Sequence, residues 1–330
     1  MITTRLTRML GIRHPVVLAG LGGVGRAELA AAVSNAGGLG MLGMIRMRPD
    51  FIRDQIRRTR ALTERPFGVN LVPPCAPEPG GVGAQLQVCI EERVPVLSLF
   101  WCDAAPLMET CRAAGMRVIH QVGSVEEARV AAAAGVDVIV AQGVEAGGHV
   151  RGELGLLSLL PAVIAAVAPV PVLAAGGIVD ARGLAAALSL GADGAWIGTR
   201  FVASAESEAH PDYKQRLLQA GGADTVISRT PQVEWPPGAA YRLLSNALTG
   251  GTATPSGPIA RIRRGDRLVE LPVSTSAPPT IHTEGQTELM ANYAGQGVGQ
   301  ISEILPAAAI VEQMVSGATD LLRRLPALIA

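Results

Sequence analysis

The sequence is poor in several residue types that mark common protein classes. Aromatic residues make up only 3% of the 330 residues, and Lys214 is the only lysine. Lys plus Arg and Asp plus Glu number 28 each, so the formal net charge is zero. Nucleic acids and anionic membranes bind proteins with a basic face, and single-stranded bases stack on aromatic side chains. We therefore expect neither nucleic acid nor a membrane as a partner.

Cysteine is also scarce and irregularly spaced. The four cysteines are Cys75, Cys89, Cys102 and Cys111, with no C-x-x-C pair and no histidine at zinc-finger distance. We favour scattered buried thiols in a reduced cytoplasm, and we expect no metal. A metal site or a disulfide framework is the alternative interpretation.

Apolar runs of membrane-spanning length are interrupted. The run from Leu154 to Val179 carries no charge, but it contains Pro161, Pro169 and Pro171. Because proline breaks helices in their interior, a buried helix followed by a buried strand is a better interpretation than a spanning helix. Near the N-terminus, Pro15 and several glycines break the apolar stretch that a signal peptide would need. We expect a soluble, cytoplasmic protein.

Short apolar strands alternate with alanine-rich amphipathic helices over the first two thirds of the chain. Continuous apolar strands such as VDVIVA are typical of a parallel sheet that is covered on both faces. Eight strand–helix units predict a closed (β/α)8 TIM barrel with its active site at the carboxyl ends of the strands. An open doubly wound sheet is the alternative. We expect strands at 16–19, 39–42, 67–71, 96–100, 117–121, 137–141, 171–174 and 194–197, and helices at 27–35, 51–61, 83–92, 105–114, 125–133, 157–167, 181–190 and 213–220.

This alternation ends after the eighth unit. Residues 222–299 are rich in Gly, Pro, Ser and Thr, with a short helix expected at 239–248. Loops this long usually act as lids or substrate walls. We therefore expect a barrel at 1–221, a substrate-side lobe inserted after the eighth strand at 222–299, and a C-terminal segment at 300–330 whose helix, 302–325, packs back on the barrel.

The first strand is followed by a glycine-rich turn. Residues Gly20–Gly25, with the sequence GLGGVG, satisfy the G-x-G-x-x-G pattern of dinucleotide-binding folds. No acidic residue follows the second strand, however. Arg46 and Arg48 lie there instead, and they would suit a 2′-phosphate. We favour a turn whose bare backbone lies against a flat cofactor ring, and the alternatives are a dinucleotide site or a turn without a ligand.

Two further turns predict a phosphate site. Ala175-Gly176-Gly177 ends the seventh strand, and Gly198-Thr199 ends the eighth. In barrels, the loops after these strands commonly bind phosphate through backbone N–H groups and a helix N-terminus. Glycine lets the backbone approach the anion, and the Thr199 hydroxyl can donate a hydrogen bond. Tight turns without a ligand are the alternative.

Polar side chains are expected at the same rim. His149 lies in the loop QGVEAGGH after the sixth strand, which we expect to be flexible, and a histidine there can donate or accept a proton at neutral pH. Asn70 and Gln121, at the ends of the third and fifth strands, would suit a ring that presents both donors and acceptors. A structural role for His149 and loop capping by the two amides are the alternatives.

With these motifs the sequence resembles the FMN-dependent nitronate monooxygenases, formerly called 2-nitropropane dioxygenases. The matching pieces span nearly the whole chain, and the combination of QGVEAGGH, AAGGI and IGTRF is specific to this superfamily. The other pieces are PVVLAGLGGV, AAVSNAGGLGMLG, FGVNL and YAGQGVG. In one departure, the first strand ends Ala19-Gly20-Leu21, where the family commonly has Ala-Pro-Met.

The resemblance implies an enzyme that binds FMN non-covalently and oxidises alkyl nitronates with O2 to a carbonyl compound and nitrite. His149 would be the catalytic histidine that faces the flavin and stabilises the anionic nitronate. NAD(P)H-dependent reductases of quinones or enoyl thioesters share these motifs and are the alternative. The partners would be a small-molecule substrate and O2, and a homodimer is one option for assembly. The cofactor-binding residues implied by the motifs and the resemblance are Ala19, Gly20, Leu21, Gly22, Asn70, Gln121, Gln142, Ala146, Gly147, Gly148, Ala175, Gly176, Gly177, Gly198, Thr199 and Gln296.

Overall fold

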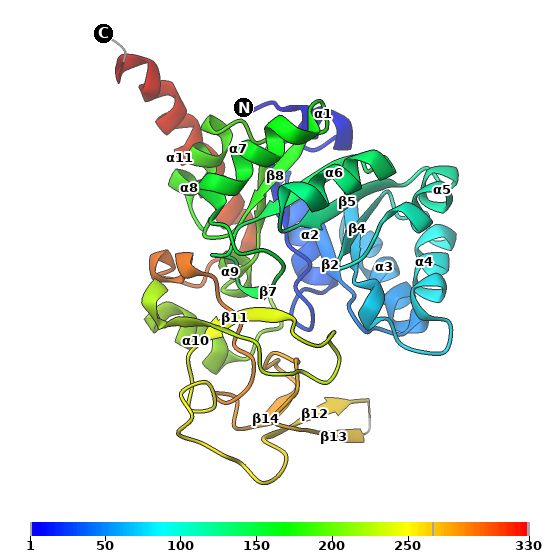
Figure 1. Ribbon diagram of the computed structural model, residues 1–330, viewed down its shortest axis with the longest axis vertical. Helices are drawn as coiled ribbons and strands as arrows, with labels where there is room; N and C mark the ends of the chain where they lie inside the picture. Colours follow the sequence, from blue (N-terminus) through cyan, green and yellow to red (C-terminus); the bar gives the residue numbers. More distant parts are fainter. Residues whose placement is uncertain (1, 266, 329–330) are drawn as a thin grey trace.

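The computed structural model describes residues 2–265 and 267–328, and its main element is an eight-stranded parallel sheet (Figure 1). The strands are β1 (Val16–Leu18), β2 (Gly40–Gly43), β3 (Phe67–Leu71), β4 (Val96–Phe100), β5 (Arg117–Val122), β6 (Val138–Gln142), β8 (Val172–Ala175) and β9 (Gly194–Ile197). Their order in the sheet is β1-β9-β8-β6-β5-β4-β3-β2, so successive strands along the chain are neighbours. All eight expected strands are confirmed, with ends that shift by one residue at most.

The sheet closes into a barrel between its first two strands. Val17 forms a parallel bridge with Leu39, and the Leu18 N–H donates to the Leu39 carbonyl at 2.9 Å. Every neighbouring pair around the ring is parallel. The carboxyl ends of all the strands therefore lie on one rim, and the predicted (β/α)8 barrel is confirmed over the open sheet.

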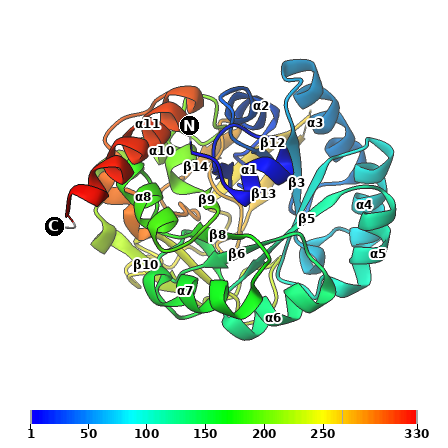
Figure 2. The ribbon, with the colours of Figure 1, turned by 90° about the horizontal axis from the view of Figure 1, so that it is seen from above.

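Helices between the strands form an outer ring, which Figure 2 shows from above. The ring helices are α2 (Ala27–Asn35), α3 (Pro49–Leu62), α4 (Gly81–Glu91), α5 (Ala105–Ala113), α6 (Val125–Ala134), α7 (Leu156–Val167) and α8 (Ala181–Ser189). Local sequence explains their ends: the Ser124 side chain caps the start of α6, and Gly135, in a left-handed conformation, ends it. The uncharged run forms α7 and then β8, as predicted. In the described part of the chain, no helix combines the length and apolarity needed to cross a bilayer.

Further short helices lie before the first barrel strand, within the barrel loops and after the last barrel strand. They are α1 (Arg5–Leu10), α9 (Thr199–Val202) and α10 (Pro211–Gln219), with 3-10 turns at η1 (Pro73–Cys75), η2 (Gly222–Asp224), η3 (Gln296–Gln300) and η4 (Leu325–Leu328). The C-terminal helix α11 (Ala307–Arg324) packs against α8 and α2, as expected. It begins later than the predicted residue 302, because Pro306 has an extended backbone and stands at the N-cap.

The lobe below the barrel in Figure 1 holds two small antiparallel sheets. One contains β10 (Thr225–Ser228), β11 (Ala240–Leu244) and β7 (Gly148–Val150), and the other contains β12 (Ala260–Arg264), β13 (Arg267–Leu271) and β14 (Thr283–Gly285). The helix expected at 239–248 is wrong, since β11 occupies its first half. This strand pairs on both sides, with β10 and β7, and these ladders outweigh the helix preference of its Ala and Leu residues.

Candidate active site

A cavity lies at the carboxyl rim of the barrel, where the lobe faces it. Every expected site residue except Gln296 lines this cavity. The Gln296 side chain is exposed, although its neighbours Gly295 and Gly297 are part of the lining. The expected residues that the structure brings together are Ala19, Gly20, Leu21, Gly22, Asn70, Gln121, Gln142, Ala146, Gly147, Gly148, His149, Ala175, Gly176, Gly177, Gly198 and Thr199.

His149 is held in a strand, so the expectation of a flexible loop is wrong. It lies in β7, whose backbone pairs with β11 of the lobe, with His149 opposite Tyr241. The Gln142 amide also fixes β7: its Nε2 donates to the His149 carbonyl at 2.8 Å, and its Oε1 accepts from the Arg151 N–H at 3.0 Å. Gln142 therefore uses its amide to position the histidine strand.

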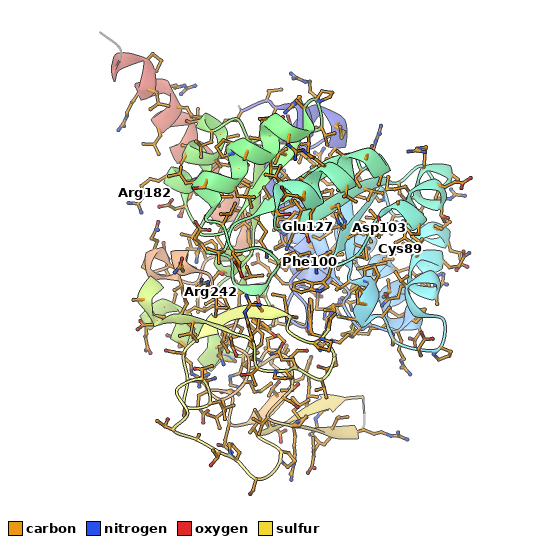
Figure 3. All side chains as sticks on the ribbon, in the orientation of Figure 1. Cys89, Phe100, Asp103, Glu127, Arg182 and Arg242 are labelled. Atoms are coloured by element: carbon orange, nitrogen blue, oxygen red, sulfur yellow. The ribbon has the colours of Figure 1, made fainter. Side chains whose placement is uncertain are left out.

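The loop between β6 and β7 is fixed from two further directions. The Glu145 carboxylate accepts hydrogen bonds from the Leu156 N–H at 2.9 and 3.0 Å and so caps α7. From the lobe, Arg242 on β11 donates to the Val144 carbonyl at 3.1 Å, and Figure 3 labels Arg242 where barrel and lobe meet. The backbone that carries His149 is thus held by both parts of the molecule.

The imidazole of His149 is almost fully buried and uncharged at neutral pH. Burial lowers its pKa from 6.5 to about 3, and a side-chain hydrogen bond with Gln232 only partly opposes this shift. Its Nε2 is buried without a hydrogen-bond partner among the described residues. A buried polar atom without a partner is costly, so this nitrogen is available to a ligand in the cavity.

Aromatic rings gather around His149, although the chain has only four Phe, three Trp and three Tyr. The Trp235 indole is stacked on the imidazole, with ring centroids 3.3 Å apart and an interplanar angle of 9°. Tyr241, Tyr293 and Trp101 lie 5.4, 5.7 and 6.3 Å away. These rings account for the dry surroundings that lower the histidine pKa.

Three glycines leave open space on the cavity side. A Cβ atom on Gly148 would meet nothing within 4 Å, and one on Gly177 or Gly198 would meet nothing closer than 3.6 or 3.8 Å. Gly148 and Gly177 have positive φ angles of 78° and 69°, which favour glycine. Thr199, the first residue of α9, presents a backbone N–H that its own helix cannot satisfy. This wall can approach an anion closely through its backbone.

Other glycines serve packing between loops. A Cβ on Gly20 would overlap the Asn70 side chain, which in turn donates to the Ser98 hydroxyl at 3.2 Å. A Cβ on Gly147 would lie 2.5 Å from the Gly295 nitrogen. The Gly295 N–H donates to the Thr199 hydroxyl at 3.0 Å. The segment after Tyr293 thus returns to the rim in direct contact with two barrel loops.

The lobe contributes site residues that the sequence did not indicate. Arg46, which follows β2, forms an ion pair with Glu234 at 2.9 Å and contacts Ser276, and the Ser276 hydroxyl donates to Glu234 at 2.8 Å. Arg46, Ser276 and Trp235 all line the cavity. The sequence indicated Arg46 only as a residue that would suit a 2′-phosphate. No local motif marks Ser276 or Trp235, because they lie in turn-rich segments that meet the rim only after folding.

The four cysteines are free thiols, and three of them, Cys75, Cys89 and Cys111, are buried, as expected. In the described part of the chain, no group of three or more His, Cys, Asp or Glu residues is arranged to hold a metal ion.

A family model described as nitronate monooxygenase matches residues 3–80 and 81–317. A nitronate monooxygenase from Pseudomonas aeruginosa is 34% identical over 95% of this chain and 99% of the relative. Two proteins named (3aS,4S,5R,7aS)-5-hydroxy-7a-methyl-1-oxo-octahydro-1H-indene-4-carboxyl-CoA dehydrogenase are also similar. The one from Mycobacterium tuberculosis is 41% identical over 75% of this chain, and the one from Rhodococcus jostii is 40% identical over 69%. These matches span only 67% and 63% of the two dehydrogenases.

Solved structures share the architecture over the whole chain. FabK from Thermotoga maritima superposes with a TM-score of 0.85 and 32% identity, covering 100% of both chains. A nitroalkane oxidase from Streptomyces ansochromogenes gives a TM-score of 0.78 and 32% identity, covering 97% of this chain and 99% of the other.

The buried histidine makes stability depend on pH. In the unfolded chain His149 takes up a proton as the pH falls below about 6.5, whereas in the folded protein it stays neutral down to about pH 3. Between about pH 7 and pH 5, we expect the wild type to lose about 2 kcal/mol more unfolding free energy than His149→Ala, measured by urea denaturation.

His282 is exposed and provides the matched control for this experiment. His282→Ala tests whether removing a histidine from the surface, rather than the buried one, changes the pH dependence. An equal loss in the wild type and His149→Ala would show that the imidazole is not held neutral by the fold.

Proposed function

The chain belongs to the nitronate monooxygenase family, and from this premise we propose that it is a flavin enzyme that oxidises alkyl nitronates with O2 to the carbonyl compound and nitrite. The observation that carries the proposal is His149, which lines the cavity and whose buried Nε2 has no hydrogen-bond partner among the described residues. A nitronate oxygen is an acceptor that this nitrogen can bind. The partners of the proposed enzyme are therefore a small-molecule substrate and O2.

We propose FMN as the flavin. Its phosphate would lie against Gly176, Gly177, Gly198 and Thr199, since the bare backbone there leaves the space and the N–H groups that an anion needs. Among the described residues, Arg46 is the only charged one in the cavity lining, so backbone dipoles would provide most of the attraction at the phosphate end. When bound, the flavin supplies the electron-transfer chemistry between the nitronate and O2.

The ring of the cofactor would lie near the first-strand turn. Ala19, Gly20, Leu21 and Gly22 line the cavity there, and Gly20 packs directly on Asn70. Gln121 lines the cavity too, and its amide can donate or accept a hydrogen bond. Leu21 keeps an apolar side chain where the family commonly has Met, so this position still offers an apolar contact.

His149 would bind and orient the substrate as a neutral imidazole. At neutral pH an uncharged ring offers the nitronate a hydrogen bond rather than a full positive charge. The surrounding rings exclude water, which strengthens that hydrogen bond. An anion at Nε2 would also raise the histidine pKa, so the same nitrogen can hold a proton while the substrate is bound.

The remaining expectations fit this enzyme. We propose that residues 222–299 act as a substrate-side lobe over a barrel at 1–221, with 300–330 returning to the barrel, because Trp235 and Ser276 of the lobe line the cavity. The free cysteines support a reducing compartment such as the cytoplasm.

A reductase is the second candidate function. The relatives at 40% and 41% identity are named as dehydrogenases of a carboxyl-CoA compound, so their named reaction differs from nitronate oxidation. Other redox reactions therefore occur among similar proteins, and an NAD(P)H-dependent enzyme acting on a quinone or an enoyl thioester would use the same proposed flavin site with a different electron donor.

The electron donor separates the two functions. We expect the FMN-loaded protein, mixed anaerobically with propane-2-nitronate in a stopped-flow spectrometer, to change its flavin absorbance, and to form nitrite when O2 is present. NADH and NADPH should leave the spectrum unchanged. Rapid bleaching by a pyridine nucleotide without a response to nitronate would establish the reductase instead, and no response to any donor would reject both functions.

Removing the imidazole should affect turnover more than cofactor binding. We expect His149→Ala to retain FMN and to lose about 100-fold or more in kcat/KM for nitronate, the lower range for removing a positioned proton-transfer group. Nitrite release and O2 consumption report the rate, and flavin absorbance reports the FMN content. His282→Ala is the exposed control, and an active His149→Ala would remove this histidine from the reaction.

Filling the glycine wall should weaken FMN binding. Gly198 has φ −105°, so a side chain there is not excluded by a positive φ, and its Cβ would meet nothing closer than 3.8 Å. We expect Gly198→Val to fold normally and to bind FMN about tenfold more weakly or worse, since overpacking costs about 1–3 kcal/mol. Fluorescence titration of FMN into flavin-free protein measures this.

Gly257 provides the matched control, because it is exposed and a Cβ there would also meet nothing within 4 Å. Gly257→Val should bind FMN like the wild type. Unchanged FMN affinity in Gly198→Val would contradict the proposed cofactor position.

A further inference from the structure

Trp235 occupies an unusual place in the cavity. It comes from the lobe, in the 229–239 connection between β10 and β11, yet its indole lies flat on His149 at 3.3 Å. Its other neighbours belong to the barrel: Trp101 packs edge-on against it at 5.4 Å. One lobe side chain therefore fills the space between the histidine and the barrel rim.

Beyond the indole lies an apolar cluster that would otherwise be part of the cavity. We call Ile45, Val72, Cys75 and Phe100 the rim cluster; they follow or end β2, β3 and β4, and Trp235 packs against them. Figure 3 labels Phe100 at the barrel edge that faces the lobe. Ile45, Val72, Phe100 and Trp235 all line the same cavity as His149. Without the indole, the space beside the histidine would continue into apolar surroundings.

The backbone around Trp235 is anchored, so the indole has a defined position. Glu234 is paired with Arg46 at 2.9 Å and accepts from the Ser276 hydroxyl at 2.8 Å. The Val233 N–H donates to the Ser274 carbonyl at 3.2 Å, and the Trp235 N–H donates to the Gln232 carbonyl at 3.2 Å. A side chain held on both sides in this way acts as a fixed wall rather than as a freely moving one.

We propose that Trp235 is a specificity-determining residue that limits the length of the apolar tail a substrate can place beside His149. The inference rests on the proposed function, because the substrate is taken to be an anion whose head group reaches His149 and whose tail is an alkyl chain. Short tails fit beside the stacked histidine and indole without reaching the volume that the indole fills. Longer tails need the volume that the indole fills against the rim cluster.

Alkyl carboxylates test this limit without turnover. Their head group is a planar anion, as in a nitronate, but they cannot undergo the proposed oxidation. We expect calorimetric titration of the wild type, with FMN added, to show affinity that stops rising beyond short chains. In Trp235→Ala, each further methylene buried should strengthen binding about fourfold. Octanoate should then bind at least tenfold more tightly than to the wild type, with propionate within about threefold.

Two variants serve as controls. Val233 is 65% exposed in the same connection, so Val233→Ala should keep the wild-type dependence on chain length. Trp235→Phe retains a ring for stacking and should fall between the wild type and Trp235→Ala. Unchanged FMN binding and circular dichroism in Trp235→Ala would show that the fold is intact.

The outcomes separate this proposal from the proposed function. The proposal for Trp235 is overturned if the wild type and Trp235→Ala show the same dependence of affinity on chain length. It is also overturned if neither protein binds any carboxylate. Nitronate turnover is measured in parallel on the wild type. If nitronate is not oxidised but Trp235→Ala strengthens octanoate binding as expected, the proposed reaction is wrong, whereas the proposal that Trp235 limits the length of the bound alkyl tail is supported.

Discussion

Closure of the barrel is the constraint on which the site depends. The bridge between Val17 and Leu39 joins the first strand to the second and forces eight parallel strands into one ring. Their carboxyl ends then share a rim, so residues as distant in sequence as Gly20, Asn70 and Gly198 border one cavity. If the sheet were open between β1 and β2, β1 and β9 would stay paired at one edge while β2 and β3 lay at the other, and Asn70 could not meet Gly20.

The lobe adds a second constraint at His149. Strand β7 leaves the barrel after β6 but pairs with β11 of the lobe, so the histidine belongs to both parts of the fold. Its low pKa follows from this arrangement, since the lobe rings cover a residue that a bare rim would leave in water. The proposed chemistry therefore depends on lobe and barrel together: the barrel provides the backbone that suits a phosphate, and the lobe desolvates the imidazole.

Much of this was predictable from the sequence where the signal is local. Apolar strands, alanine-rich helices and glycine turns repeat along the barrel, and they placed the strand ends to within one residue. The lobe was not predictable in the same way, because segment 240–244 becomes a strand only by pairing with β7 and β10. Trp235 and Ser276 reach the cavity through contacts between distant segments, and Gln296, within a matching motif, has its side chain exposed to solvent.

The cavity thus divides into two walls with different physical origins. One wall is barrel backbone, whose glycines cannot be replaced without filling space or straining φ, so it would constrain the proposed cofactor strongly. The other wall is made of lobe side chains such as Trp235, which can change size without disturbing the strand ladder. A family built in this way can keep its flavin site while altering the tail, or even the class, of its substrate.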